Sequence, residues 1–384
     1  MFEFTAEASN LKKALAIASL SVDENQDTIE GHALFTFKDN KIFIHATNKD
    51  KISVSYLPIK EEHIEHAVSF TVSPKRLQAI INKADEDLVK FKYDPQTSTL
   101  NVYASEEKNA YVSFASFNPE DFPSFIADIA IAKHIKDINS TTLLMGIRFI
   151  QGFLPGDDKS KKYSNLYIDN GILYGSNGAN KVGAFTSSDL EKITGINIRR
   201  IMLIPVSSFI DKISIPEVIL KASSKSIILS SPDGLYQFGF RKSILELPKL
   251  PISIDIPTCN GINIDRNLLL KKITRLALTT KEEIGLKMSV KDDAVEIHTT
   301  SDRESYEKIG CTRISGTDPF DFIIECKRFR STLTMFQADY VNMYIDKTRC
   351  TIYNNGDLIF EEAGKEPVKK SFVAVGVITL ARPE

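Results

Sequence analysis

The sequence lacks the short motifs by which many enzymes bind phosphate, zinc or an acyl group. It contains no GxxxxGK[ST] phosphate loop, no HExxH pair and no GxSxG turn. Carboxylates are plentiful, but no pair stands out from the background as an acid–base couple. We therefore predict that the protein is not an enzyme and that it needs no metal and no cofactor.

Cysteine and histidine are scarce and are not arranged as metal ligands. The four cysteines contain no CxxC pair, so we expect reduced, mostly buried thiols and a cytoplasmic protein. His63 and His66 are three residues apart beside several glutamates, which would suit either a metal patch or a solvated loop. We favour the loop. The cysteines are Cys259, Cys311, Cys326 and Cys350.

Long apolar runs are also missing. The run Phe372–Leu380 has the length of a strand and is far too short to span a membrane. The opening Met1-Phe2-Glu3-Phe4 does not resemble a secretory signal. With 384 residues, 42% hydrophobic and 26% charged, the chain is long enough for two or three globular domains.

One unit recurs three times along the chain. Its first mark is a hairpin of alternating apolar and polar residues around an Asp-containing turn. Each hairpin lies between two helical segments, and a second hairpin follows. The first helices are expected to start near Ser9, Asn139 and Asp265, which are good N-cap residues. The second helices are expected to start near Ser73, Pro205 and Cys326, each after a β-rich run, namely Phe70–Val72, Ile201–Ile204 and Phe322–Ile324. The first hairpins occupy residues 35–48, 166–177 and 288–301, and the second hairpins 88–117, 217–240 and 340–380.

Proline-rich stretches mark where the pattern restarts. Asn118-Pro-Glu-Asp-Phe-Pro123 and Leu247-Pro-Lys-Leu-Pro251 fall at the two junctions, although prolines also occur in ordinary loops. We predict an α+β fold of three tandem domains, 1–125, 126–254 and 255–384, each with two helices packed on antiparallel sheets.

The predicted helices carry apolar stripes on one face and concentrate positive charge on the rest of their surface. The stripes are Leu77, Ile80, Ile81 and Ala84, then Leu269, Ile273 and Leu276, and then Phe329, Leu333 and Phe336. The six segments sum to +12, so the rest of the chain carries −14 to give the net charge of −2. A solvated helix face often carries lysine, but six helices in an acidic protein favour sequence-independent binding to DNA phosphates. The candidate DNA-binding residues are Lys12, Lys13, Lys75, Arg76, Lys83, Arg148, Lys212, Arg266, Lys271, Lys272, Arg275, Lys327, Arg328 and Arg330.

Together these features resemble the bacterial β sliding clamp, the β subunit of DNA polymerase III, or a divergent or phage-encoded member. The likeness covers the whole chain and includes the Asp-Phe-Pro junction at 121–123. The turn Ser176-Asn-Gly-Ala-Asn-Lys-Val-Gly183 replaces the Ala-Thr-Asp-Gly-His-Arg-Leu-Ala typical of the family. The resemblance implies a ring of two subunits, paired head to tail around duplex DNA, with helices lining the hole.

The resemblance also implies partners and the residues that meet them. A cleft between the second and third repeats would accept peptides from the replicative polymerase, the clamp loader and other proteins. Residues 377–380 could instead be only the last core strand, but we favour the cleft. The family's Met-Pro-Met type of ending is replaced here by Ile378-Thr-Leu380. The matching cleft positions are Asn177, Lys181, Val182, Pro248, Leu250, Ile378, Thr379 and Leu380, and the homodimer seam would involve Tyr111, Ser113, Leu278 and Thr279.

Three functions are therefore compared. The first is a processivity clamp that encircles DNA and performs no chemistry. The second is a clamp-like scaffold used as a transcription or assembly factor, and the third is an enzyme built from repeated α+β units, such as a nuclease. The missing carboxylate cluster argues against the nuclease.

Overall fold

The computed structural model forms two compact units, and each takes residues from two stretches of the chain. Unit 1 comprises Met1–Ser140 and Ile204–Lys242, and unit 2 comprises Thr141–Leu203 and Ser243–Glu384. The predicted boundaries of the three domains remain predictions. The structure describes residues 1–38, 41–59, 67–84, 87–104, 110–123, 129–156, 163–178, 180–243, 252, 255–279, 285–300, 305–360 and 368–380.

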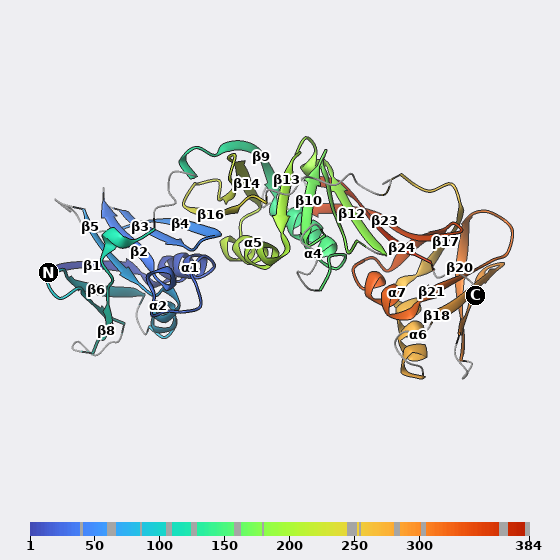
Figure 1. Cartoon of the computed structure of the whole chain (residues 1–384), viewed down its shortest axis with the longest axis horizontal. Coiled ribbons are helices and arrows are strands. Elements are labelled where there is room, and N and C mark those ends of the chain that lie inside the picture. Colours follow the sequence, from blue (N-terminus) through green and yellow to red (C-terminus); the bar gives the residue numbers. More distant parts are fainter. Residues whose placement is uncertain are drawn as a thin grey trace. The chain divides into compact units, whose positions relative to one another are not determined.

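Unit 1 contains two antiparallel sheets and two neighbouring helices, α1 and α2 (Figure 1). The sheets follow the orders β5-β2-β3-β4-β16-β15-β14-β9 and β1-β6-β7-β8. The elements are β1 Phe2–Glu7, α1 Ala8–Ala18, β2 Ala33–Lys38, β3 Lys41–Thr47, β4 Lys51–Pro58, β5 Val68–Val72, α2 Pro74–Ile81, β6 Leu88–Asp94, β7 Thr99–Tyr103, β8 Val112–Ala115, β9 Lys133–Asn139, β14 Glu217–Ala222, β15 Ser226–Ser230 and β16 Tyr236–Arg241, with 3-10 turns at Ile29–Gly31 and Pro119–Asp121.

Aromatic rings fill the space between the sheets of unit 1. Phe4 stacks on Phe91 with ring centroids 4.5 Å apart, and it also contacts Phe37 at 4.3 Å. Phe35 and Phe70 stack at 5.2 Å, and both are buried. Full burial of such rings is a large part of the hydrophobic free energy that holds two sheets together.

Unit 2 is built on one antiparallel sheet, ordered β13-β10-β11-β12-β24-β23-β22-β17-β20-β19-β18-β21. Helix α6 packs beside α7 (Figure 1). Helix α4 begins at the boundary of the unit, and α5 crosses that boundary. The elements are α4 Ser140–Gln151, β10 Asn165–Asp169, β11 Ile172–Ser176, β12 Lys181–Ser187, β13 Ile196–Arg199, α5 Arg200–Ile213, β17 Asn260–Asp265, α6 Arg266–Thr279, β18 Gly285–Lys291, β19 Ala294–Thr299, β20 Tyr306–Ser315, β21 Phe320–Glu325, α7 Cys326–Leu333, β22 Tyr340–Ile345, β23 Arg349–Phe360 and β24 Val368–Thr379, with a 3-10 turn at Ser188–Leu190.

Two strand pairs join segments that belong to different predicted repeats. In unit 1, β4 pairs with β16 from Lys51–Phe240 to Ser55–Tyr236. In unit 2, β12 pairs with β24 from Lys181–Ile378 to Ser187–Phe372. We call this second pair the seam. Because backbone hydrogen bonds continue through both pairs, each large sheet runs without a break from one repeat to the next.

Glycine allows an aromatic ring to lie directly on the seam. Gly183 and Gly376 face each other across β12 and β24, and both approach Phe153. A Cβ atom at Gly183 would lie 2.4 Å from a Phe153 ring carbon, and one at Gly376 would lie 2.9 Å from the same ring. Phe153 is almost completely buried. Any side chain at either glycine would displace this ring.

The predicted hairpins and apolar helix faces are confirmed. The first hairpins form as β2–β3, β10–β11 and β18–β19. In α2, Leu77 and Ile81 are buried. Ser73, at the predicted start, is the N-cap and accepts a hydrogen bond from the Arg76 amide at 3.4 Å. The stripes in the other two helices are also buried, namely Leu269, Ile273 and Leu276 in α6, and Phe329, Leu333 and Phe336 at α7.

Two local predictions were wrong. The run Ile201–Ile204 is not a strand, because α5 already begins at Arg200 and Pro205 lies inside it. A run of four apolar residues is too short to show whether apolar residues recur with the period of a strand or of a helix. Pro205 was expected at the start of the helix because proline removes one backbone hydrogen bond from a helix interior. In addition, α1 is preceded by Glu7 as its N-cap rather than by Ser9.

The requirement for glycine at position 183 can be tested by substitution. Gly183→Ala should lower the free energy of unfolding by about 1–3 kcal/mol, because Phe153 must move out of a filled core. Gly310→Ala in exposed β20 is the matched control, since its Cβ would meet only one atom, at 3.9 Å. The control should be neutral or stabilising by about 0.5 kcal/mol. Urea midpoints of the two variants measure this, and equal midpoints would contradict the argument.

Candidate functional site

The predicted basic residues fall into two groups. Lys83, Lys212 and Lys271 are exposed and form no ion pair with any residue that the structure describes. Arg148 and Lys327 are also exposed, whereas Lys12, Lys75 and Arg330 are half-buried. The remaining members of the predicted set are engaged with other parts of the protein.

Three of these engaged cations, Lys13, Arg266 and Arg76, bind carbonyl or carboxylate oxygens of the same chain. Lys13 donates from Nζ to the carbonyl of Ile213 at 2.8 Å, at the end of α5, where the helix dipole favours a cation. Arg266 donates to the carbonyls of Ala338 at 2.7 Å and Leu333 at 3.3 Å, and so fixes the start of α6 to the end of α7. Arg76 forms an exposed ion pair with Asp27 at 3.0 Å.

A carboxylate on β20, that of Glu307, binds two more of the predicted basic residues. Glu307 accepts from Lys272 at 2.9 Å and from Arg275 at 2.7 Å. The side chains of Lys272 and Glu307 are only 15% and 17% exposed. The positive charges of Lys272 and Arg275 are therefore partly neutralised by Glu307. The sequence did not predict this, because Glu307 is distant in the chain from both helix residues.

The turn before β12 is ordered by an asparagine. The Asn177 side-chain oxygen accepts from the backbone amides of Asn180 at 3.1 Å and Lys181 at 3.0 Å. The Asn180 carbonyl accepts in turn from the Thr379 amide at 3.1 Å, and the Leu380 amide donates to Thr348 at 2.8 Å. This turn and the end of β24 therefore lie side by side.

The predicted cleft residues differ in accessibility. Thr379 is exposed, and Asn177, Lys181, Val182 and Leu380 are half-buried. Ile378 is completely buried, so its side chain is part of the core and does not face solvent. Pro248 and Leu250 lie outside the described residues.

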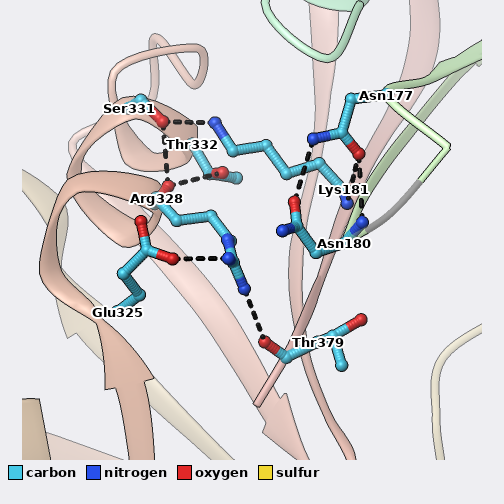
Figure 2. Close-up of polar contacts among 8 residues, drawn as sticks. All are labelled: Asn177, Asn180, Lys181, Glu325, Arg328, Ser331, Thr332 and Thr379. Carbon is cyan, nitrogen blue, oxygen red and sulfur yellow. Dashed lines mark hydrogen bonds and ion pairs between the residues drawn. The ribbon is translucent and has the colours of Figure 1, made fainter. Parts of the chain in front are cut away.

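A polar cluster connects β12, β24 and the first turns of α7 (Figure 2). Lys181 donates from Nζ to the Ser331 hydroxyl, which donates to the Arg328 carbonyl at 2.9 Å. The Arg328 guanidinium pairs with Glu325 and reaches the Thr379 carbonyl at 3.5 Å. Arg328 is one of the residues predicted to bind DNA, and in the structure its guanidinium contacts Glu325 and Thr379. Glu325 and Ser331 were not predicted, since only the fold brings α7 to the seam.

The electrostatics of the cluster are dominated by burial and by two cations. Burial lowers the pKa of Lys181, the positive charge of Arg328 lowers it further, and Glu325 opposes the change. With its amide turned by 180°, Asn180 would accept from the Arg328 guanidinium at 2.6 and 3.2 Å. The cluster thus contains two cations, Lys181 and Arg328, and one carboxylate, Glu325.

Three of the four residues predicted for the dimer interface lie at exposed positions. Tyr111 and Ser113 are exposed at the start of β8, an edge strand of the four-stranded sheet. Leu278 is 83% exposed near the end of α6. The side chain of Thr279 lies outside the described residues. An exposed leucine and an open strand edge are both suited to contact with another chain.

Unit 2 also contains a cavity of about 550 Å³ between α4, the segment after α7, and β12, β23 and β24. Phe149, Phe185, Phe336 and Phe372 form much of its wall, with Arg148, Asn354 and Asn355 among the polar lining residues. No pattern in the sequence indicates this cavity.

No feature of the described chain indicates a metal centre. Within those residues, no group of three or more His, Cys, Asp and Glu side chains could hold a metal ion. His63 and His66 lie outside the described residues. Cys326 and Cys350 are buried, Cys259 and Cys311 are half-buried, and none of the four forms a disulfide. Among the described helices, none is long and apolar enough to cross a membrane.

Three solved structures of sliding clamps have the same fold. The chain superposes on the DNA polymerase III subunit beta from Pseudomonas aeruginosa with a TM-score of 0.78, 13% identity and coverage of 100% of both chains. The clamp from Caulobacter crescentus gives 0.79, 13% and the same coverage. That from Bartonella birtlesii, solved bound to griselimycin, gives 0.76 and 13% over 99% of each chain.

The chain therefore has the sliding-clamp fold. More particularly, this is the fold of the bacterial DNA polymerase III β subunit, over its full length, and the predicted α+β fold class is confirmed. No protein-family model matches the sequence, and no curated protein matches it.

The two neighbouring cations of the cluster should affect the free energy of unfolding and its dependence on pH. Lys181→Met should raise the free energy of unfolding at pH 7 by about 0.5–1 kcal/mol, because it removes a half-buried cation that faces another. The folded-state pKa of Lys181 lies below the ordinary 10.5. The wild-type protein therefore gains stability as the pH rises from that lowered value to 10.5, and the advantage of the variant should shrink over this window.

Urea unfolding at a series of pH values from 7 to about 11 measures this difference, with Lys181→Arg as the charge-preserving control. A variant that is less stable than wild type at pH 7, or a difference that does not change with pH, would refute it.

Proposed function

We propose that the protein is a DNA sliding clamp, a non-enzymatic processivity factor. Two copies would pair head to tail to close a ring around duplex DNA, and the ring would tether a replicative polymerase in the cytoplasm. The observation that carries this proposal is the agreement in fold with sliding clamps over the whole of both chains. The three tandem domains of the sequence analysis are part of the proposal.

The charge distribution supports it. Lys83, Lys212 and Lys271 are exposed on or beside α2, α5 and α6, the helices that would line the hole. Contacts between lysines and phosphates do not depend on base sequence, as sliding requires. Topological closure would keep the protein on DNA, so the electrostatic attraction need not be strong.

The edge of β8 and the surface beside the β12–β24 seam support the proposed dimer and the proposed binding of partner peptides. The exposed β8 edge with Tyr111, and Leu278 on α6, would meet in the homodimer. Thr379, Lys181 and the half-buried Val182 and Leu380 would form part of a cleft for peptides of the polymerase, the clamp loader and other partners.

A second function is favoured by a different observation. Lys13, Arg266, Lys272 and Arg275 are engaged inside the protein, which leaves fewer cations for DNA than the sequence predicts. A clamp-like scaffold that serves transcription or assembly without encircling DNA would tolerate this loss. Ring closure on DNA distinguishes the two functions.

Retention on plasmid DNA provides the test. After loading onto nicked circular plasmid, the protein should co-elute with DNA through gel filtration and should be lost when the plasmid is linearised, because a ring can slide off a free end. The same plasmid, cut or uncut, is its own control. Equal loss from circular and linear DNA would exclude a topological ring and favour the scaffold.

The role of exposed lysines can be tested within one helix. Lys271→Gln should reduce the slope of log K against log salt for DNA binding by about one, because one phosphate contact is lost. Lys272→Gln is the matched control, since its charge is already held by Glu307 at 2.9 Å, and its effect should be much smaller. Fluorescence anisotropy at several salt concentrations measures both slopes. Equal slopes for the two variants and wild type would remove α6 from the DNA-binding surface.

A further inference from the structure

We propose that the cavity of unit 2 binds a single nucleotide. We call it the nucleotide pocket, and it lies between α4, the segment after α7, and β12, β23 and β24. Its volume of about 550 Å³ falls within the range of about 300–1,000 Å³ that is typical of small-molecule sites. The ligand that fits its walls is a free nucleoside monophosphate, with the base against phenylalanine rings and the phosphate beside Arg148. The inference goes beyond the proposed function and does not depend on closure of a ring.

The nucleotide pocket and the predicted peptide cleft lie on opposite faces of the seam. Phe185 on β12 and Ala374 on β24 line the pocket and are paired directly across the two strands. Because side chains alternate between the faces of a sheet, Val182 and Thr379 of the predicted cleft, each an odd number of residues away, point to the other face. Phe153 covers the two seam glycines and fills the space between the pocket and the end of β24. The pocket is therefore a separate site.

Aromatic rings form the inner walls of the nucleotide pocket. Phe149, Phe185 and Phe336 are buried, and Phe372 is half-buried. Phe149 contacts Phe336 edge-on with ring centroids 5.1 Å apart, and Phe185 stacks on Phe372 at 5.9 Å. Aromatic surface that meets only water is unfavourable, whereas every nucleobase has a flat face that can stack on such rings. The walls therefore favour a planar aromatic ligand.

The more exposed part of the lining is polar. Thr334, Gln337 and Asn355 are exposed, and Asn354 is half-buried. Each of the three carboxamides has N–H donors and a carbonyl acceptor. The edge of adenine also presents a donor beside an acceptor, and asparagine and glutamine pair with it through two hydrogen bonds. The polar lining therefore suits a nucleobase better than it suits a purely apolar ligand.

The charge of the lining favours an anion. Among the described residues of the wall, Arg148 alone is charged, and it is exposed on α4. A guanidinium group is planar and binds phosphate oxygens through two parallel N–H donors. One cation without a carboxylate in the described lining matches one phosphate group. A DNA strand would bring a series of phosphates, for which the described wall offers no second cation.

The nucleotide pocket is held open by close approaches within the protein. Met335 lies against Gly152, just after α4, where any Cβ atom would overlap the Met335 sulfur. Gly356 likewise admits the ring of Phe372, since a Cβ atom there would lie 2.9 Å from it. These approaches connect α4 with the segment after α7, and β23 with β24. The walls are therefore in place before a ligand arrives, and binding would cost little conformational entropy.

The test uses three ligands that separate the base from the phosphate. The full chain is titrated with dAMP, deoxyadenosine and deoxyribose 5-phosphate by calorimetry or ligand-observed NMR. We expect dAMP to bind about tenfold more tightly than deoxyadenosine, because only its phosphate forms a charge-assisted hydrogen bond with Arg148, and about tenfold more tightly than deoxyribose 5-phosphate, which cannot stack. Arg148→Gln should lower the affinity for dAMP to that for deoxyadenosine, and Phe372→Leu should weaken both by about fivefold.

Lys287→Gln is the matched control, because it also removes one exposed cation from unit 2. Lys287 lies on β18, pairs with Asp321 at 3.5 Å and does not line the nucleotide pocket. This variant should bind all three ligands as wild type does. Arg148 is exposed, so its replacement leaves the core unchanged. Circular dichroism and urea unfolding establish that Phe372→Leu is folded before it is titrated.

The outcomes are independent of retention on circular plasmid, which tests the clamp alone. No binding of dAMP at millimolar concentration, equal binding of dAMP and deoxyadenosine, or full affinity for dAMP in Arg148→Gln would overturn the nucleotide pocket. An equal loss of affinity in Lys287→Gln and Arg148→Gln would indicate a general attraction between charges and would also overturn it. So would a single-stranded oligonucleotide that binds more tightly than dAMP and loses its affinity in Phe372→Leu, because the ligand would then be a nucleic acid strand.

Discussion

Backbone hydrogen bonding across repeat junctions is the constraint on which the rest of this structure depends. A strand at the end of one repeat would otherwise expose a row of unpaired amides and carbonyls. Pairing β4 with β16 and β12 with β24 satisfies these groups. The same pairing brings the turn at Asn177, the end of β24 and the first turns of α7 together, so the seam also creates the polar cluster.

Positive charge is concentrated in the helices, but part of it is neutralised or bound by neighbouring groups of the same chain. The helices carry an excess of lysine and arginine, as the sequence indicates, yet Glu307, two helix ends and Asp27 bind several of these groups. Each cation that is bound within the chain presents less positive charge to its surroundings, so fewer of the predicted phosphate contacts are available. The remaining exposed lysines retain a diffuse, salt-dependent attraction.

Local patterns in the sequence were sufficient for the hairpins, the apolar stripes of α2, α6 and α7, and the α+β class. These features depend on residues within a few positions of one another. The start of α5 was not predictable in this way, because Ile201–Ile204 fits a strand or a buried helix equally well and tertiary packing decides between them. Arg328 was assigned to DNA by composition alone, whereas its environment is set by Lys181 and Thr379, which are distant in sequence. The cavity beside Phe372 and the bridge at Glu307 were missed for the same reason.

The ring of Phe153 between Gly183 and Gly376 has an evolutionary consequence. The ring leaves no volume for a Cβ atom on either strand, so these three positions share one fixed amount of space. A lineage that acquires a side chain at 183 or 376 must first, or simultaneously, reduce the residue at 153. Divergent relatives of this protein should therefore change the three sites in concert, even where the surrounding sequence has drifted beyond recognition.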